Sequence, residues 1–257
     1  MNTTVVEWNN VSFAWPDGTP ALRDVSLRLE TGESVGLLGA NGAGKTTLLL
    51  LAVGCLIPAS GTVRVDGVAV EPKTLADIRR RLGFVFQDAD DQLFLPTVLE
   101  DVAFGPLNHG MTREEARTRA EETLAAVGAS GLAQRPPHRL SGGEKRIAAL
   151  ATALAVSPLA LLLDEPTSGL DPCARERLAR LFETLRPACL VATHDLPFAR
   201  AACGRVVVLS EGCVVAEGET ADILDDRALL ERVGLALPSQ RDAGPDSRSR
   251  TGSAGAD

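Results

Sequence analysis

The fold is decided by the stretch Gly39-Ala40-Asn41-Gly42-Ala43-Gly44-Lys45-Thr46, which matches the phosphate-binding pattern G-x-x-x-x-G-K-[ST]. An apolar run typical of a buried strand precedes it (Val35–Leu38), and a segment typical of a helix follows it (Thr46–Ala52). In this order the backbone N–H groups of the loop point at phosphate oxygens, and the helix dipole adds to the attraction. The pattern predicts that Lys45 reaches the β- and γ-phosphates of a nucleotide and that the Thr46 hydroxyl binds Mg²⁺.

Short strand-like runs alternate with helical segments along the rest of the chain. Strands are predicted at Thr4–Val11, Val25–Leu29, Thr62–Asp66, Phe84–Phe86, Leu159–Leu163 and Leu190–Thr193, and helices at Thr112–Val127 and about Ser141–Ala155. Thr112 and Glu115 form a predicted capping box, and Glu211-Gly212 is the predicted turn of a hairpin. Buried apolar strands that alternate with helices indicate a mainly parallel α/β sheet.

The composition excludes several kinds of partner and site. The 257 residues carry a net charge of −8, with 4% aromatic residues and no tyrosine, which argues against nucleic acid as a partner. Five scattered cysteines and three histidines argue against a zinc site and favour free thiols in a reducing cytoplasm. The N-terminus lacks a signal-peptide pattern, and the apolar runs Leu48–Ile57 and Ile147–Leu163 are too short or too interrupted to cross a membrane.

An acidic pair at the end of the apolar run Leu159–Leu163 supplies a second part of the nucleotide site. Asp164 stands where a carboxylate completes the Mg²⁺ site, and Glu165 stands where a general base activates water. Such a pair is by itself a weak signal, because acidic residues at strand ends often cap helices. Together with the Lys45 loop it becomes a candidate for metal binding and hydrolysis.

The stretch Leu140-Ser141-Gly142-Gly143-Glu144 lies between these two elements. It resembles the signature motif L-S-G-G-Q of ATP-binding-cassette (ABC) ATPases, with Glu144 in place of the final glutamine. Other markers of this family follow in order, since Gln87 resembles the Q-loop glutamine, Ser168–Asp171 the D-loop and His194 the switch histidine. The resemblance implies the α/β fold of a P-loop NTPase of ABC type, with a mainly parallel core sheet, an N-terminal antiparallel β subdomain and an inserted α-helical subdomain.

The resemblance covers residues 4–237, with the helical subdomain at about 88–157, and residues 239–257 are predicted to form a disordered tail. It implies Lys45, Gln87, Glu165 and His194 as catalytic residues, and Thr46, Gln87 and Asp164 as Mg²⁺ ligands. The implied ATP contacts are Trp15, Gly39, Ala40, Asn41, Gly42, Ala43, Gly44, Lys45, Thr46, Thr47, Ser141, Gly142, Gly143 and Glu144. Trp15 is expected to stack on adenine, with Phe13 as the alternative. The signature residues are expected to act on the ATP of a second subunit that binds head to tail.

The segment after Gln87 indicates the kind of ABC protein. Residues 88–94 (DADDQLF) and 96–108 (PTVLEDVAFGPLN) resemble the ATPases of energy-coupling-factor (ECF) importers, as do SGGEKR at 141–146 and VATHDL at 191–196. This implies a peripheral subunit at the cytoplasmic face of the cell membrane, on which integral membrane transport subunits dock through Gln87–Asn108. The second ATPase subunit is an identical or a paralogous chain.

Cobalt or nickel is the expected cargo, and a vitamin importer or another ABC transporter is the alternative. A soluble ABC ATPase without a transport role is disfavoured, because no sustained heptad pattern separates the Lys45 loop from the signature.

Overall fold

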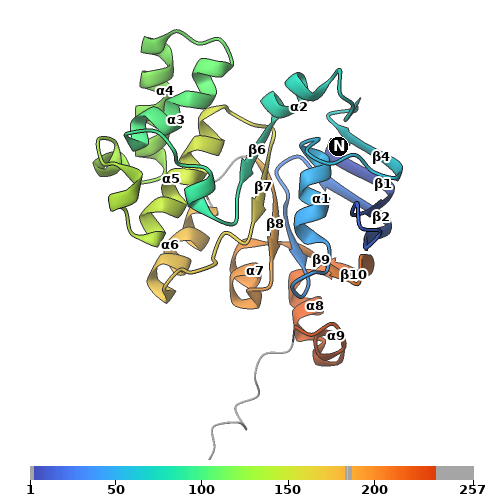
Figure 1. The fold of residues 1–257 in the computed structure, drawn as a ribbon. Coiled ribbons are helices and arrows are strands. Elements are labelled where there is room, and N and C mark those ends of the chain that lie inside the picture. Colours follow the sequence, from blue (N-terminus) through green and yellow to red (C-terminus); the bar gives the residue numbers. More distant parts are fainter. Residues whose placement is uncertain (1–2, 183, 185–186, 236–257) are drawn as a thin grey trace, which may run out of the picture.

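The computed structural model describes residues 3–182, 184 and 187–235, which form two sheets flanked by helices (Figure 1). The N-terminal sheet is antiparallel and has the strand order β2-β1-β4-β5, made of β1 (Thr4–Ala14), β2 (Pro20–Glu30), β4 (Ser60–Val65) and β5 (Val68–Ala69). Trp8 on β1 lies opposite Leu27 on β2 and Val63 on β4, and its indole donates to the Leu48 carbonyl at 3.0 Å. This bond fastens the antiparallel sheet to the helix that follows the phosphate loop.

The second sheet has the order β10-β9-β3-β8-β7-β6. Its strands are β3 (Ser34–Leu38), β6 (Leu82–Val85), β7 (Ala160–Asp164), β8 (Ala188–Thr193), β9 (Arg205–Ser210) and β10 (Cys213–Glu219). All neighbours pair in parallel except β9 and β10, which confirms the predicted mainly parallel sheet. The carboxyl ends of parallel strands meet at one edge, where ligands bind in open α/β sheets. The segments that follow β3, β6, β7 and β8 therefore gather there.

The predicted hairpin between β9 and β10 is present, and both turn residues have positive φ, Glu211 at 50° and Gly212 at 78°. This is the backbone conformation of a two-residue turn that matches the twist of its strands. The strand predicted at Phe84–Phe86 ends at Val85, and the Phe86 side chain is exposed.

Alternation along the central strands distributes their side chains between two hydrophobic cores. Leu162 on β7 faces the core shared with the antiparallel sheet and with α1 (Lys45–Ala52), whereas Leu161 and Leu163 face the opposite core. The second core is covered by α6 (Pro172–Phe182), α7 (Leu196–Ala202), α8 (Thr220–Asp225) and α9 (Arg227–Arg232). A short helix, α2 (Leu75–Arg81), leads from the antiparallel sheet into β6.

Three further helices stand together beside the β6 edge of the sheet (Figure 1). They are α3 (Val98–Asn108), α4 (Arg113–Ala126) and α5 (Gly142–Ala155), and they share a core that includes Val102, Leu124 and Ala148. Each of them begins with a capping box, and the one predicted between Thr112 and Glu115 is confirmed. Short 3₁₀ turns, η1 (Ala89–Asp91), η2 (Ser130–Leu132) and η3 (Pro137–Arg139), connect the group. The subdomain bounds 88–157 stay a prediction.

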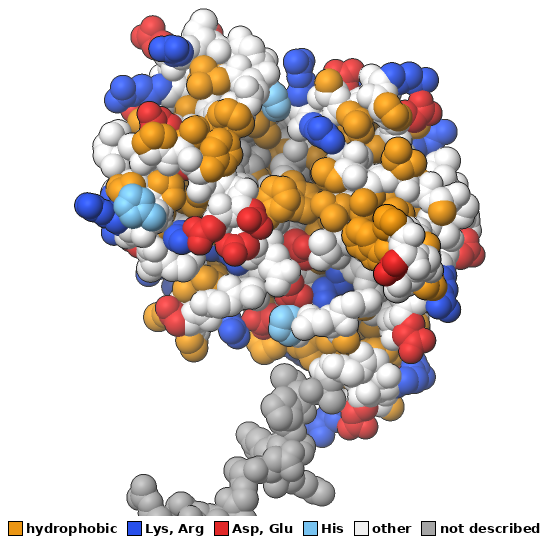
Figure 2. All heavy atoms as spheres, viewed as in Figure 1, with side chains coloured by type: hydrophobic (Ala, Val, Ile, Leu, Met, Phe, Trp, Pro, Cys, Tyr) orange, Lys and Arg blue, Asp and Glu red, His pale blue; other side chains and the backbone are white. Residues whose placement is uncertain are grey.

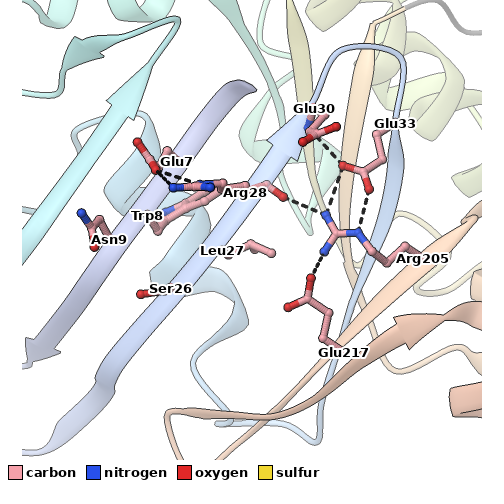
Figure 3. A pocket seen from close by; sticks show the side chains of 10 residues that line it. All are labelled: Glu7, Trp8, Asn9, Ser26, Leu27, Arg28, Glu30, Glu33, Arg205 and Glu217. Atoms are coloured by element: carbon pink, nitrogen blue, oxygen red, sulfur yellow. Dashed lines mark hydrogen bonds and ion pairs between the residues drawn. The ribbon is translucent and has the colours of Figure 1, made fainter. Parts of the chain in front are cut away.

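A charged pocket of about 640 Å³ lies between the antiparallel sheet and the β9–β10 hairpin (Figure 3). Arg205 on β9 binds Glu33 at 2.7 Å, Glu217 on β10, and the Arg28 carbonyl at 2.8 Å. Arg28 in turn binds Glu7. These charged side chains are paired with one another, and the contacts of Arg205 with Glu33 and with the Arg28 carbonyl connect the two sheets.

The predicted tail, 239–257, lies outside the described residues. Within the described part of the chain, none of the helices combines the length and the apolar character needed to span a membrane.

Candidate functional site

The phosphate-binding loop leaves the end of β3 and enters α1, as its sequence predicts. Gly44 has φ of 106°, and a Cβ atom there would meet the Ala21 carbonyl oxygen at 2.5 Å. A Cβ atom at Gly39 would meet the Leu209 carbonyl oxygen at the same distance. A side chain at either position would therefore displace the backbone of β2 or β9, so the glycines allow the loop to close against both strands.

Lys45 is the first residue of α1, and its side chain is 6% exposed. Its ammonium group donates to the carbonyls of Gly39 at 2.7 Å and Ala40 at 3.3 Å, and lies 3.2 Å from Glu165 Oε1. A buried ammonium held by the loop's own carbonyls is placed to bind phosphate oxygens that approach the loop. Lys45 and Glu165, which the sequence assigns to one nucleotide site, therefore lie next to each other.

Glu165 follows β7 in the left-handed region, with φ of 44°. A non-glycine residue in this region stores backbone strain, which functional sites tend to collect. Its Oε2 accepts a hydrogen bond from Thr193 Oγ1 at 3.1 Å, and its Oε1 lies 3.0 Å from Nδ1 of His194. His194 stands at the end of β8, next to β7 in the sheet, so the strand order brings these residues together.

Asp164 ends β7 and accepts a hydrogen bond from the Thr46 hydroxyl at 2.7 Å through Oδ2. Its other oxygen, Oδ1, is buried and has no hydrogen-bond partner among the described residues. Burial raises the pKa of this carboxyl, and the hydrogen bond from Thr46 opposes the shift. A carboxylate oxygen without a partner beside a hydroxyl offers the hard oxygen ligands that Mg²⁺ takes, so these residues fit that ion.

A cavity of about 600 Å³ opens over this pair. Thr46, Gln87 and Asp164 all line it, so the three predicted Mg²⁺ ligands lie around one space. Gln87 reaches it because β6 neighbours β7 in the sheet, and the Gln87 side chain is exposed. Gly142 of the signature lines the same cavity.

Ser141 is the N-cap of α5, and Glu144 completes a capping box with it. Glu144 Oε2 accepts from the Ser141 backbone N–H at 2.8 Å and from its hydroxyl at 2.9 Å, and these bonds lower the pKa of Glu144. Arg135 donates to the other oxygen at 2.7 Å. Because glutamate and glutamine both serve at this position of a capping box, the departure from L-S-G-G-Q preserves the start of the helix.

The two candidates for adenine stacking touch each other. Phe13 and Trp15 meet edge to face with ring centroids 5.3 Å apart, at the end of β1 and in the turn that follows. Trp15 is 40% exposed, whereas Phe13 packs against the core. The more exposed ring is the one free to meet a base.

The predicted docking segment Gln87–Asn108 carries exposed aromatic and acidic side chains. Phe94 and Phe104 are 62% and 42% exposed and meet edge to face at 5.2 Å. Asp88, Asp90 and Asp91 are exposed beside them along the chain. Figure 2 shows acidic side chains gathered next to hydrophobic ones on this face of the molecule.

Two arginines that the sequence reasoning left without a role connect the loops around the site. Arg175 donates to the Leu170 carbonyl at 3.1 Å and lies 3.4 Å from Asp195, the residue after His194. Arg146 is buried in α5 and reaches the backbone of Phe86 and Gln87. In the sequence, the only hint of a buried role for Arg146 is its place directly before an apolar, alanine-rich stretch of predicted helix.

Comparisons with known proteins agree with this geometry. The sequence model described as ABC transporter matches residues 22–168, which is more than half of the chain. The chain belongs to the ABC transporter family. The predicted ABC ATPase fold is confirmed. The chain binds and hydrolyses ATP.

Similar proteins narrow the type within this family. The cobalt import ATP-binding protein CbiO of Rhodobacter capsulatus is 50% identical, with 92% of this chain and 86% of that protein covered. The energy-coupling factor transporter ATP-binding protein EcfA of Methanosphaera stadtmanae is 42% identical, with 92% and 87% covered.

A solved structure of cbiO1 from Clostridium perfringens, described as part of the ABC transporter complex cbiONQ, is also similar. It has a TM-score of 0.80 and 34% identity, with 91% of this chain and 96% of that chain covered. The chain is accordingly an ABC transporter ATP-binding subunit of the CbiO and EcfA type.

Proposed function

We propose that this subunit is part of an ECF-type importer, is bound at the cytoplasmic face of the cell membrane, and energises the import of cobalt or nickel ions. The observation that carries the proposal is the 50% identity to a cobalt import ATP-binding protein over nearly the whole chain. The similarity to cbiO1 supports it. A vitamin importer is the second candidate, favoured by the 42% identity to an energy-coupling factor protein.

The residues around the Lys45 loop divide the work of ATP hydrolysis between them. The loop residues 39–47 and Trp15 hold the nucleotide, and Lys45 neutralises charge on its terminal phosphates. Glu165 takes a proton from the water that attacks the γ-phosphorus, and the bond from that phosphorus to the ADP oxygen breaks. Thr193 Oγ1, 3.1 Å from Glu165 Oε2, and His194 Nδ1, 3.0 Å from Glu165 Oε1, support this role because these contacts orient the carboxylate.

A divalent cation is the remaining requirement of the reaction. Thr46, Asp164 and Gln87 would hold Mg²⁺, which when bound neutralises charge on the β- and γ-phosphates. The unpartnered Asp164 Oδ1 and the shared cavity support this assignment.

A second ATPase subunit, identical or paralogous, completes each nucleotide site in the proposed assembly. Its Ser141–Glu144 segment faces the γ-phosphate that the first subunit holds, because the N-terminus of α5 attracts anions through its N–H groups and dipole. ATP bound between the subunits then joins them, and hydrolysis releases the interface.

Integral membrane transport subunits are proposed to dock on Gln87–Asn108. The exposed Phe94–Phe104 pair offers an apolar anchor, and the acidic side chains at positions 88 and 91 select a partner segment with basic residues.

Affinity purification of the tagged chain from membranes tests the proposal. We expect integral membrane proteins to co-purify, and cells that produce the complex to accumulate Co²⁺ or Ni²⁺ in an ATP-dependent way. Phe94→Ser should abolish co-purification, whereas Val215→Ser, at an exposed position on β10 outside the docking segment, should preserve it. Uptake of a vitamin without uptake of either metal would transfer the assignment to the second candidate.

A further inference from the structure

Arg146 has a position that the roles above do not explain. It lies in the second turn of α5, and only 5% of it is exposed. Its Nη1 donates to the Phe86 carbonyl at 2.8 Å, and its Nη2 donates to the Gln87 carbonyl at 2.8 Å. The same Nη2 also donates to the Ser168 carbonyl at 3.4 Å. One guanidinium thus reaches three carbonyls on two separate loops.

The energetics argue that stability alone does not account for this arginine. Burial lowers the pKa of Arg146, while the charges of Asp88 and Asp164 oppose the shift. Its Nε has no hydrogen-bond partner among the described residues, and within that part of the chain no carboxylate pairs directly with it. A buried cation without a paired anion often stabilises the folded protein no more than an apolar side chain of similar size would.

The three carbonyls belong to the segments that frame the cation and phosphate site. Phe86 and Gln87 follow β6, and Ser168 follows Glu165 by one short turn, with the Ser168 N–H bound to the Glu165 carbonyl at 3.0 Å. Gln87, Arg146 and Ser168 line the same cavity as Thr46 and Asp164. The guanidinium therefore links the backbones of Gln87 and Ser168 at the cavity that Thr46 and Asp164 line.

Two neighbouring side chains tie the same segment to α5. Gln92 accepts from the Phe86 N–H at 3.1 Å and donates to the Ala149 carbonyl at 2.9 Å. Lys145 binds Asp90 at 2.5 Å. These contacts tie the segment from Phe86 to Gln92 to α5, and among the three side chains Arg146 alone also binds Ser168.

We propose that Arg146 is a positioning residue for ATP hydrolysis, which holds Gln87 and Ser168 in place and so couples the signature helix α5 to the site of Thr46 and Asp164. The proposal rests on the proposed roles of Gln87 and Asp164. A displacement of the signature helix then changes the geometry of the hydrolytic site through these two loops. Misplacement of reacting groups by about 1 Å can lower a rate about 10²-fold.

Two variants and one control test it on the purified full-length chain. Arg146→Lys keeps the charge but cannot donate in a fork to two carbonyls, and Arg146→Met keeps the length without charge. Arg205→Lys makes the same change in a half-buried arginine that also joins three segments, away from the nucleotide loop (Figure 3). We expect both Arg146 variants to lose kcat by about 10²-fold. Their KM for ATP should stay within about twofold, because the Lys45 loop is untouched.

Calorimetric titration and thermal unfolding supply readouts that are independent of turnover. In the absence of Mg²⁺, both Arg146 variants should bind ATP with the affinity of the unmodified chain. The Mg²⁺ concentration that gives half of the Mg²⁺-dependent change in ATP affinity should be several-fold higher in both variants. Arg146→Met should retain its melting temperature, and Arg205→Lys should retain kcat.

An unchanged kcat in folded Arg146→Lys and Arg146→Met would overturn the proposal, as would an equal loss of kcat in Arg205→Lys. Failure of metal uptake would count against the proposed function only, because these assays use the isolated subunit.

Discussion

Replacing Glu165 with glutamine removes the proposed base while keeping the shape of the side chain. The carboxylate presents Oε1 to Lys45 at 3.2 Å and to His194 at 3.0 Å, and Oε2 to Thr193 at 3.1 Å. An amide has one oxygen and no charge, so either Thr193 loses its acceptor or an NH₂ group replaces the oxygen beside Lys45 and His194. Loss of a buried acceptor costs about 1–3 kcal/mol, and each kcal/mol lowers Tm by about 2–4 °C in a chain of this size.

The effect of Glu165→Gln on turnover should be far larger than its effect on stability. Removal of a general base lowers the rate by about 10²- to 10⁴-fold. ATP affinity should be preserved, because Lys45 keeps its place through the Gly39 and Ala40 carbonyls. An ATP-bound dimer should therefore accumulate, since binding persists while hydrolysis does not release the interface.

The assay combines steady-state phosphate release with size-exclusion chromatography in the presence of ATP. Glu217→Gln is the matched control, because it makes the same change in a glutamate that binds Arg205 in the pocket of Figure 3. The control should hydrolyse ATP at the unmodified rate and show no trapped dimer. If Glu165→Gln hydrolyses ATP at the unmodified rate, Glu165 is not the base.

Three further substitutions probe the nucleotide loop, the adenine site and the docking segment. Lys45→Ala should weaken ATP binding by about 10- to 100-fold in a fluorescent-ATP titration, since hydrogen bonds to charged groups contribute about 1.5–3 kcal/mol, and unchanged affinity would contradict its phosphate role. Trp15→Ala should lose about 1–3 kcal/mol of adenine stacking by calorimetric titration, and a larger loss in Phe13→Ala would assign the stacking to Phe13. Asp101 in the docking segment accepts hydrogen bonds from the backbone N–H groups of residues 94 and 95, and burial raises the pKa of its carboxyl group. The free energy of unfolding of the unmodified chain therefore falls as the pH rises above the ordinary aspartate pKa of about 3.9. The melting temperature of Asp101→Asn relative to the unmodified chain should therefore rise as the pH increases from about 4 to 7, and a difference that is constant with pH would refute this reasoning.

The local features of the site were predictable because each depends on a few consecutive residues. The glycines of residues 39–44 specify a loop that curls around phosphate, and an apolar run before it specifies a buried strand. The capping box at Thr112 and the hairpin turn at Glu211-Gly212 have the same local origin, and the structure contains both. Side-chain chemistry at strand ends, as at Asp164 and Glu165, could be read in the same way.

The boundaries of elements were less predictable, because they depend on partners elsewhere in the chain. Phe86 continues an apolar run in the sequence, yet β6 ends at Val85, where its ladder with β7 ends at Leu163. In the sequence Arg146 has no assigned role beyond its place in SGGEKR at 141–146, and only the packing of α5 turns it inward toward the carbonyls of Phe86 and Gln87.

The sequence by itself determined which chemical groups are present and which local shape each motif takes. The tertiary structure alone decided which groups meet, because the strand order β9-β3-β8-β7-β6 differs from the order along the chain. That order places the ends of β3, β8 and β7 side by side, so Lys45, His194 and Glu165 converge although more than a hundred residues separate Lys45 from Glu165. Pairing between distant strands depends on the summed burial and hydrogen bonding of the whole sheet, and no local pattern encodes it.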